Sequence, residues 1–434
     1  MQTSIQTSPL YSNLLGDEET AAILDASIEI QAMIRVELAL ASAQSSIGMI
    51  PDSIGAELAA ALANVEPNRQ ALAQGLSSSG VPVPALLAEL RKELPSELSH
   101  WLHWGATSQD IVDTASMLQI ADCLSLFGTR LSALLDALHL QSNEYATTLM
   151  AARTRTQLAT PITLGLRLAQ WAQPLIRMEK ELPALRAYVL RVQFGGAAGA
   201  NTAVAPHGPA IAAAMAEILN LANSPPWHTD RSGIVALANW LLQVCLSLSK
   251  MAKDLMIMSR SEIAELSAGT AGGSSTMPQK ANPVQSEMVV ALGTIAQALH
   301  GGICAAASPV EERDGASWTV EWALLPQLLV TTGSALRHSL DLVETLTINT
   351  QRMQSIVDEN SQLMAEAASF ALAELLPRTE AQALVKQAAA SAKPLPQALA
   401  DVCQIELNWE EILDPSVVCA PAKQISDSIF SCRI

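Results

Sequence analysis

Aromatic residues, basic residues and paired cysteines are all scarce in this chain. Of 434 residues only 3% are aromatic and 25 are Lys or Arg, against 42 Asp and Glu, which gives a net charge of −17. Nucleic acids and anionic lipids are bound through clusters of cations, so neither is expected as a partner. An anionic small molecule would need the few cations to be gathered locally.

The cysteines and the first residues exclude two further classes. The six Cys are scattered and show no CxxC or Cys/His spacing, which predicts neither a disulfide framework nor a metal site. Residues 1–13 are rich in Ser, Thr and Gln and contain no basic segment followed by an apolar run. We therefore expect reduced thiols and a cytoplasmic protein without a secretion signal.

Long stretches without charge raise the alternative of a membrane protein. Residues 232–249 and 288–310 contain no charged side chain. These runs include Gln243 and His300, however, and their flanks lack the Lys/Arg asymmetry of membrane loops. A helix that is apolar on all sides also suits the centre of a large bundle, so we expect no membrane partner.

The composition favours an all-α fold, because Ala and Leu dominate and both are strong helix formers. Residues 234–268 contain no Gly or Pro, and about 35 residues at 1.5 Å each would make a helix about 50 Å long. Residues 129–160 and 334–376 are equally free of helix breakers, and strand patterns are nearly absent. Such apolar rods predict a bundle whose faces are covered by other subunits, and hence an oligomer.

Helix breakers divide the chain into three predicted domains. Residues 1–111 carry short helices interrupted by Gly and Pro, residues 112–350 carry the long helices, and residues 351–434 carry short helices again. We therefore predict an N-terminal helical domain, a central bundle of long helices and a C-terminal helical domain.

A polar, Gly-rich loop interrupts the apolar sequence. Residues 269–287 read GTAGGSSTMPQKANPVQSE, in which Ser274 and Ser275 offer hydroxyls, Lys280 a cation and Asn282 an amide. Together with the N–H groups of a Gly-rich turn, these side chains could hold a carboxylate and move a proton. A simple surface loop of the same composition is the alternative.

The string GSSTMPQKANP in this loop resembles the signature GSSxMPxKxNP of the fumarase/aspartase superfamily, which includes argininosuccinate and adenylosuccinate lyases. The resemblance implies that Ser274 exchanges a proton at the carbon next to a substrate carboxylate, with Ser275 as the alternative. Serine is a poor base at its free pKa, so the alkoxide must be stabilised, for which Lys280 is the candidate. Asn282 would bind a carboxylate.

A second segment, residues 103–114, reads HWGATSQDIVDT. Hydroxyls just before an apolar helical run can cap that helix and direct its N–H groups at an anion, although capping alone is the alternative. The segment resembles the first shared region of the superfamily. This implies that Thr107, Ser108 and Gln109 bind a substrate carboxylate and that His103 acts near the reaction centre, unless the ring only packs between its neighbouring Trp residues.

A third segment, residues 153–165, reads RTRTQLATPITLG and resembles the superfamily's RTHxQxAxPxTxG stretch. Thr154 and Gln157 keep their places as substrate-binding candidates. Many members have His where this chain has Arg155, which cannot act as a general base at neutral pH. The cycloisomerase branch also lacks this His, so the departure favours that branch and makes Arg155 a candidate carboxylate clamp.

The substrate class is narrowed by the residues that follow Arg313. Adenylosuccinate lyases bind a nucleotide phosphate with Ser and Arg five and nine positions after this Arg, where the chain has Trp318 and Trp322. A phosphate would lose its partners, whereas Arg313 remains a candidate for a substrate carboxylate. The stretches that resemble the cycloisomerase branch are residues 193–200, 226–231, 312–326 and 407–415.

The resemblance implies a three-domain, all-helical homotetramer, with a central bundle of long helices and active sites built from three subunits. The implied reaction is lactonisation of 3-carboxy-cis,cis-muconate to 4-carboxymuconolactone in protocatechuate (β-ketoadipate) degradation, without metal or organic cofactor. A related lyase acting on another carboxylated substrate, and a non-catalytic member of the fold, are the alternatives. A tricarboxylate needs several cations, and the candidates are Arg153, Arg155, Arg231, Lys280 and Arg313.

Overall fold

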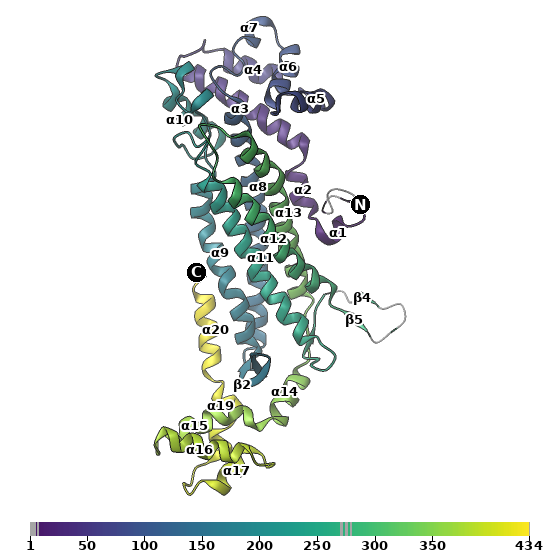
Figure 1. The fold of residues 1–434 in the computed structure, drawn as a ribbon, viewed down its shortest axis with the longest axis vertical. Coiled ribbons are helices and arrows are strands. Elements are labelled where there is room, and N and C mark those ends of the chain that lie inside the picture. The colour runs from purple at the N-terminus through teal and green to yellow at the C-terminus, as the bar shows by residue number, and fades with distance from the viewer. Residues whose placement is uncertain (1–5, 7, 270–271, 274–276, 278–279, 434) are drawn as a thin grey trace. The chain divides into compact units, whose positions relative to one another are not determined.

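The computed structural model of the chain describes residues 6, 8–269, 272–273, 277 and 280–433. Helices dominate this part of the chain, and the strands form three short antiparallel pairs (Figure 1). The all-α prediction is confirmed. The α-helices are α1 (Ser12–Leu15), α2 (Glu18–Ile23), α3 (Ala26–Ser46), α4 (Ile54–Leu62), α5 (Arg69–Ser79), α6 (Val83–Lys92), α7 (Ser96–Ser99), α8 (Ser108–Glu144), α9 (Leu164–Val189), α10 (Gly208–Leu219), α11 (Ser232–Met258), α12 (Val284–Ala306), α13 (Gly315–Glu344), α14 (Thr350–Glu359), α15 (Ala365–Ala373), α16 (Arg378–Ala389), α17 (Leu395–Val402), α18 (Trp409–Ile412), α19 (Pro415–Val418) and α20 (Pro421–Ser431). The strands are β1 (Leu149–Thr154), β2 (Gln157–Thr163), β3 (Leu266–Ser267), β4 (Gly272–Gly273), β5 (Ala281–Asn282) and β6 (Thr347–Ile348). Short 3-10 helices are η1 (Gly196–Ala198), η2 (Thr202–Val204) and η3 (Ser361–Met364).

Contacts divide the chain into two compact units. The first unit comprises Met1–Thr129, Glu181–Cys245 and Leu292–Ala335, and the second comprises Arg130–Lys180, Leu246–Ala291 and Leu336–Ile434. The helices α8, α9, α11, α12 and α13 contribute residues to both units. The division into three domains at residues 111 and 350 stays a prediction.

In the first unit, α3 packs against α4 and α10 (Figure 1). Its first turn is capped by the Asp25 carboxylate, which accepts a hydrogen bond from the Ser27 N–H at 2.8 Å and so satisfies one of the free donors of the helix start. Met33, Val36 and Leu40 are buried at three- and four-residue steps, the spacing of one helix face. This packing fixes the neighbouring residues of the same face, which include Glu37.

In the second unit, a β-hairpin corrects the prediction of a helix over residues 129–160. The helix α8 ends at Glu144, and β1 then pairs with β2. The backbone of β1 is held by burial rather than by local preference, since Met150 and Ala151 are completely buried. Strand formation depends on such packing partners far along the chain, which the absence of Gly and Pro does not reveal.

The other two predicted rods are also shorter than the sequence suggested. The helix α11 ends at Met258, and Ala264 then adopts a left-handed φ of 52°. The following strand β3 pairs with β6, which interrupts the rod expected over residues 334–376. An ion pair holds the residues between α11 and β3 in place. The fully buried Glu265 accepts two hydrogen bonds from Arg153 of β1, at 2.9 and 3.0 Å.

The tip of the β1–β2 hairpin is strained, and this strain leads to a prediction. Arg155 and Thr156 both have positive φ, 50° and 70°, a conformation that costs an L residue other than glycine about 1–2 kcal/mol. Thr156→Gly should therefore raise the free energy of unfolding, by about 0.5–1 kcal/mol after the greater chain entropy of glycine is subtracted. Urea unfolding of both proteins measures the difference, and a variant less stable than wild type would show that the tip is not strained.

Among the described residues, the helices α8, α11 and α12 are long and apolar enough to cross a membrane, by length and composition alone. The most apolar window of α8 is 67% buried within the chain, whereas that of α12 is only 33% buried. Ile295 is among the exposed large hydrophobic side chains, whereas Val289, Leu292 and Ile303 of the same helix are buried.

Candidate functional site

The start of α8 is organised by a single buried carboxylate, that of Asp110. Its oxygens accept hydrogen bonds from the N–H groups of Thr107 at 3.0 Å, Gly195 at 2.9 Å and Gly196 at 3.0 Å, and contact Nε2 of His228 at 2.9 Å. Asp110 is completely buried, so these partners replace the water that a carboxylate requires. The contacts join the predicted segment at residues 103–114 to two segments that lie about a hundred residues further along the chain.

Only glycine fits at position 195 of this assembly. A Cβ there would lie 2.7 Å from Cε1 of His228, closer than real Cβ atoms come to their neighbours. The close approach lets the Gly195 N–H reach Asp110 while His228 reaches the same oxygen. The sequence did not single out Asp110 or His228, although both lie inside segments that resemble the superfamily.

Arg313, in the segment before α13, contacts the residues that surround the Asp110 carboxylate. Its Nη1 donates to the Thr107 hydroxyl at 2.6 Å, and its Nη2 donates to the carbonyls of Gly196 at 3.2 Å and Ala197 at 2.6 Å. All three partners are neutral, and no carboxylate forms an ion pair with Arg313 in the part of the chain that the structure describes. The neighbouring Asp314 instead accepts from Ser317 and from backbone N–H groups.

An arginine that is held in place but not neutralised is suited to bind an anion. Its guanidinium can donate paired hydrogen bonds to a carboxylate, and the Thr107 hydroxyl beside it can join them. The structure thus brings together two of the predicted substrate-binding residues, Thr107 and Arg313, from positions 206 residues apart.

The other predicted residues of this segment lie differently. Gln109 is buried, and its amide nitrogen donates to Asp113 at 3.2 Å and to the His228 carbonyl at 3.3 Å, whereas its Oε1 has no partner among the described residues. Ser108 begins α8 and is partly exposed. His103 contacts Glu37 through Nδ1 at 2.7 Å. Gln109 therefore faces the protein interior, while Ser108 and His103 remain reachable by solvent.

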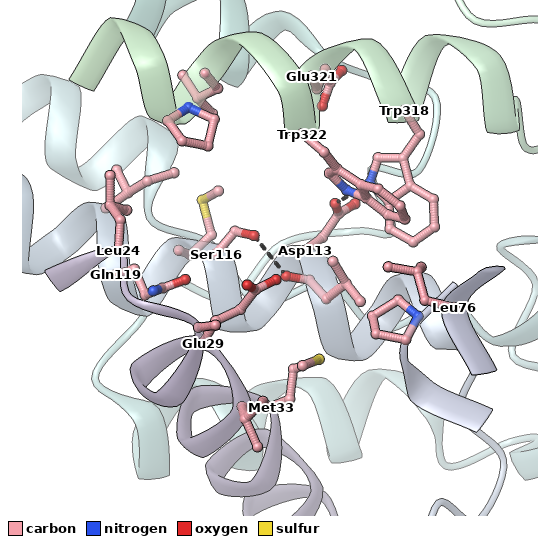
Figure 2. Close-up of a pocket in the computed structure, with 18 of the residues that line it drawn as sticks. Leu24, Glu29, Met33, Leu76, Asp113, Ser116, Gln119, Trp318, Glu321 and Trp322 are labelled. Carbon is pink, nitrogen blue, oxygen red and sulfur yellow. Dashed lines mark hydrogen bonds between the residues drawn. The ribbon is translucent and has the colours of Figure 1, made fainter. Parts of the chain in front are cut away.

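Behind Gln109 lies a buried ionic cluster around Arg231. The guanidinium donates to Asp113 at 2.8 and 3.3 Å and also pairs with Glu321. Trp318 donates its indole N–H to Asp113 at 2.9 Å (Figure 2). Both carboxylates raise the pKa of Arg231 above its usual value although burial lowers it, so the guanidinium stays charged. Arg231 was a candidate for a substrate carboxylate, but its charge is already compensated.

The same cluster forms one wall of a mainly apolar cavity of about 390 Å³ in the first unit (Figure 2). Glu29 projects into it from α3, among Leu24, Met33 and Leu76. Water reaches Glu29 through the open side of the cavity, yet the apolar surroundings raise the pKa of its carboxyl above the usual value.

This raised pKa gives a prediction for stability. The unfolded chain ionises Glu29 at the usual pH, whereas the folded chain resists ionisation, so folding stability falls as pH rises from the usual pKa of Glu through the raised one. Glu29→Gln should remove this fall and give a higher melting temperature above that pH window. Thermal unfolding of both proteins from pH 4 to 8 tests it, and parallel curves would contradict it.

The predicted residues of the third segment lie in the second unit. Thr154 ends β1 opposite Gln157, and Arg155 stands between them at the exposed hairpin tip. The Arg155 side chain makes no hydrogen bond or ion pair with a described residue, so its charge is available. Arg153, in contrast, is paired with Glu265 and is not a free cation.

The signature loop is closed at its base by the β4–β5 pair, in which Gly272 lies opposite Asn282 (Figure 1). Lys280 is exposed, and its side chain has no partner among the described residues. Ser274 and Ser275 lie outside the described residues. The structure thus leaves three of the five candidate cations uncompensated in the part it describes, namely Arg155, Lys280 and Arg313.

The residues of the described ranges show no group of three or more His, Cys, Asp or Glu arranged to hold a metal ion.

A family model described as lyase matches residues 10–297, about two thirds of the chain. The chain belongs to this lyase family, within the fumarase/aspartase superfamily. The chain is therefore an enzyme of that superfamily.

Similar proteins match nearly the whole length of this chain. A 3-carboxy-cis,cis-muconate cycloisomerase of Bradyrhizobium diazoefficiens is 36% identical over 430 residues, which is 96% of this chain and 94% of the relative. The crystal structure of the 3-carboxy-cis,cis-muconate lactonizing enzyme of Pseudomonas putida superposes with a TM-score of 0.88 at 32% identity, covering 98% of both chains. A fumarate lyase structure from Mesorhizobium sp. BNC1 gives 0.90 at 28% identity, with 98% of this chain and 100% of that chain covered.

Proposed function

We propose that the chain is a 3-carboxy-cis,cis-muconate cycloisomerase, which forms 4-carboxymuconolactone in protocatechuate degradation. The observation that carries the proposal is the name shared by relatives that match nearly the whole chain. The site supports it, because Arg313 is an uncompensated cation beside the Thr107 hydroxyl, as an anionic substrate requires.

In the proposed reaction one carboxylate of the substrate forms a C–O bond to a carbon of the conjugated double bond. The electron pair of that double bond moves to the carbon α to another carboxylate, which spreads the charge and then accepts a proton at that carbon. Arg313 and Thr107 would bind a substrate carboxylate, with Asp110 holding Thr107 in place. Ser274, or Ser275, would deliver the proton, with Lys280 stabilising the alkoxide.

We infer that the enzyme is a soluble, cytoplasmic homotetramer whose active sites combine residues of several subunits. The low buried share of α12, a helix apolar enough to cross a membrane, supports an oligomer, because another subunit can cover the rest of such a helix in water. The motif residues also fall into both units of the chain, the first motif in one and the loop and hairpin in the other. Purification without detergent and a mass four times 45.9 kDa by light scattering are expected.

The function is tested by adding the purified protein to 3-carboxy-cis,cis-muconate and following the loss of ultraviolet absorbance of the conjugated diene. Rapid loss with formation of the lactone is expected. Argininosuccinate and adenylosuccinate serve as comparison substrates. A folded protein that leaves the muconate unchanged but eliminates fumarate from one of them would replace the proposal with the related lyase activity.

Ser274→Ala should lower kcat by about 10²–10⁴-fold, because the proton at the carbon α to the carboxylate loses its donor. The tetramer should remain intact by gel filtration. Ser261→Ala is a matched control, since Ser261 is exposed and its hydroxyl has no partner among the described residues. If Ser274→Ala turns over normally while Ser275→Ala does not, the proton transfer belongs to the second serine of the loop.

A further inference from the structure

A second buried carboxylate, that of Glu37, serves a single partner. Glu37 lies on the buried face of α3, its side chain is 0% exposed, and Oε1 contacts Nδ1 of His103 at 2.7 Å. Its other oxygen, Oε2, has no partner among the described residues. A buried carboxylate with one of its oxygens unsatisfied destabilises a fold, so packing alone gives no reason for a glutamate at this position.

The backbone of His103 is also held in a conformation that requires support. Its φ of 66° lies in the left-handed region, which residues other than Gly rarely adopt. Backbone strain of this kind tends to occur where a side chain must be aimed at a ligand. The contact with Glu37 fixes the ring that the strained backbone presents.

The free side of the ring is accessible. The His103 side chain is 16% exposed, and Nε2 has no partner among the described residues. Because Nδ1 faces a carboxylate, Nδ1 carries the proton, and a protonated ring has its second N–H on the free side. Glu37 from α3, Asp110 from α8 and Arg91 from α6 are the charged groups that act on the ring.

His103 shares a charged neighbour, Asp110, with the residues expected to bind the substrate carboxylate, Thr107 and Arg313. Asp110, whose charge reaches His103, is the same carboxylate that holds the Thr107 N–H, and Thr107 is the residue that Arg313 contacts. Burial lowers the pKa of His103, but Glu37, and to a lesser degree Asp110, raise it above its usual value overall. The imidazolium is therefore favoured in the same segment as Thr107, four residues before it.

We propose that Glu37 is a positioning residue, which holds the His103 ring through Nδ1 so that Nε2–H donates a hydrogen bond to a carboxylate of the bound substrate. The inference rests on the proposed function for the identity of the substrate, but the pair itself can be tested without turnover. Glu37 and His103 would then supply the site with a cation whose charge depends on pH, beside the permanent charge of Arg313.

The direct test is NMR titration of protein labelled with ¹⁵N-histidine, with the His103 signals assigned by His103→Gln. In Glu37→Gln the ring should titrate at lower pH than in wild type. Tricarballylate, a saturated tricarboxylate, should shift the Nε2 signal of wild type and shift it far less in the variant at pH 7.5. Glu29→Gln, the same change on the same helix, is the matched control and should leave the His103 titration unchanged.

Kinetics provide the second readout. In Glu37→Gln, KM at pH 7.5 should rise about tenfold, the size expected for a lost charge-assisted hydrogen bond, with a smaller change in kcat. The alkaline limb of kcat/KM should move to lower pH, and KM should approach the wild-type value in acid, which a general loss of structure would not produce. Glu37→Asp keeps the charge, so its KM at pH 7.5 should lie between those of wild type and Glu37→Gln. It replaces Glu37→Gln in these experiments if the Gln variant does not fold.

An unchanged His103 titration in Glu37→Gln, or in Glu37→Asp if only that variant folds, would overturn the proposal. So would an unchanged KM profile in an active variant. If wild type binds tricarballylate at His103 but does not lactonise the muconate, the pair stands and the proposed function fails. If wild type lactonises the muconate and the variant does so with the same pH profile, the function stands and the role of Glu37 is wrong.

Discussion

Arg313→Gln should lower kcat/KM by about a hundredfold, mainly through KM. The guanidinium is held by Thr107 and two carbonyls but is not neutralised, so its full charge is available to a substrate carboxylate. Charge-assisted hydrogen bonds contribute about 1.5–3 kcal/mol, which corresponds to about ten- to a hundredfold in affinity. Glutamine keeps a polar group near Thr107 but removes the charge and the paired donors.

Two further variants, one at Arg313 and one at an exposed arginine outside the site, separate charge from geometry. Arg313→Lys keeps the charge without the planar fork and should give an intermediate loss. Arg260→Gln removes a positive charge from an exposed position whose nearest carboxylate, Glu262, is 4.0 Å away, and should leave kcat/KM unchanged. An Arg313→Gln enzyme within twofold of wild type would show that Arg313 does not bind the substrate.

Arg231→Met should lower the free energy of unfolding by about 3–5 kcal/mol, the largest stability change expected here. The substitution leaves two carboxylates, Asp113 and Glu321, buried without their common partner. Asp113 also accepts from Trp318 and Gln109, so its disturbance should reach the start of α8. The urea midpoint, measured by circular dichroism at fixed protein concentration, reports the loss.

Two control proteins show whether the loss of stability in Arg231→Met comes from the unpaired buried carboxylates. Combining Arg231→Met with Asp113→Asn and Glu321→Gln removes the unpaired charges and should recover much of the stability. Lys423→Met breaks an exposed pair with Asp427 and should cost about 1 kcal/mol or less. If Arg231→Met were no more destabilising than Lys423→Met, the cluster would not be a stabilising element.

The helical character of the chain could be predicted because it depends on local composition and spacing. The ends of the helices could not, since they depend on distant partners. The strand β1 lies inside a Gly-free and Pro-free stretch, and it forms a strand because Met150 and Ala151 are buried there. After the end of α11, Glu265 is likewise held by Arg153, 112 residues away.

The candidate site could likewise be predicted from the sequence only in part, because its contacts also join residues far apart in the chain. The motifs identified Thr107 and Arg313, which the structure brings into contact, but they also gave Arg153 and Arg231 as candidate cations and did not show which candidates are structural. Pairing with buried carboxylates decides which arginine is available, and such pairs leave no trace in a spacing pattern. Glu37 was missed for the same reason, since it is 66 residues from His103.

The most direct test of the account is the reaction of 3-carboxy-cis,cis-muconate with the enzyme in D₂O, followed by proton NMR beside a sample without enzyme. We predict 4-carboxymuconolactone that carries one deuterium at the carbon α to a carboxylate, because the chemistry is addition of a carboxylate with protonation at that carbon. Unchanged muconate in the presence of the folded protein, or a lactone formed no faster than in the control, would contradict it.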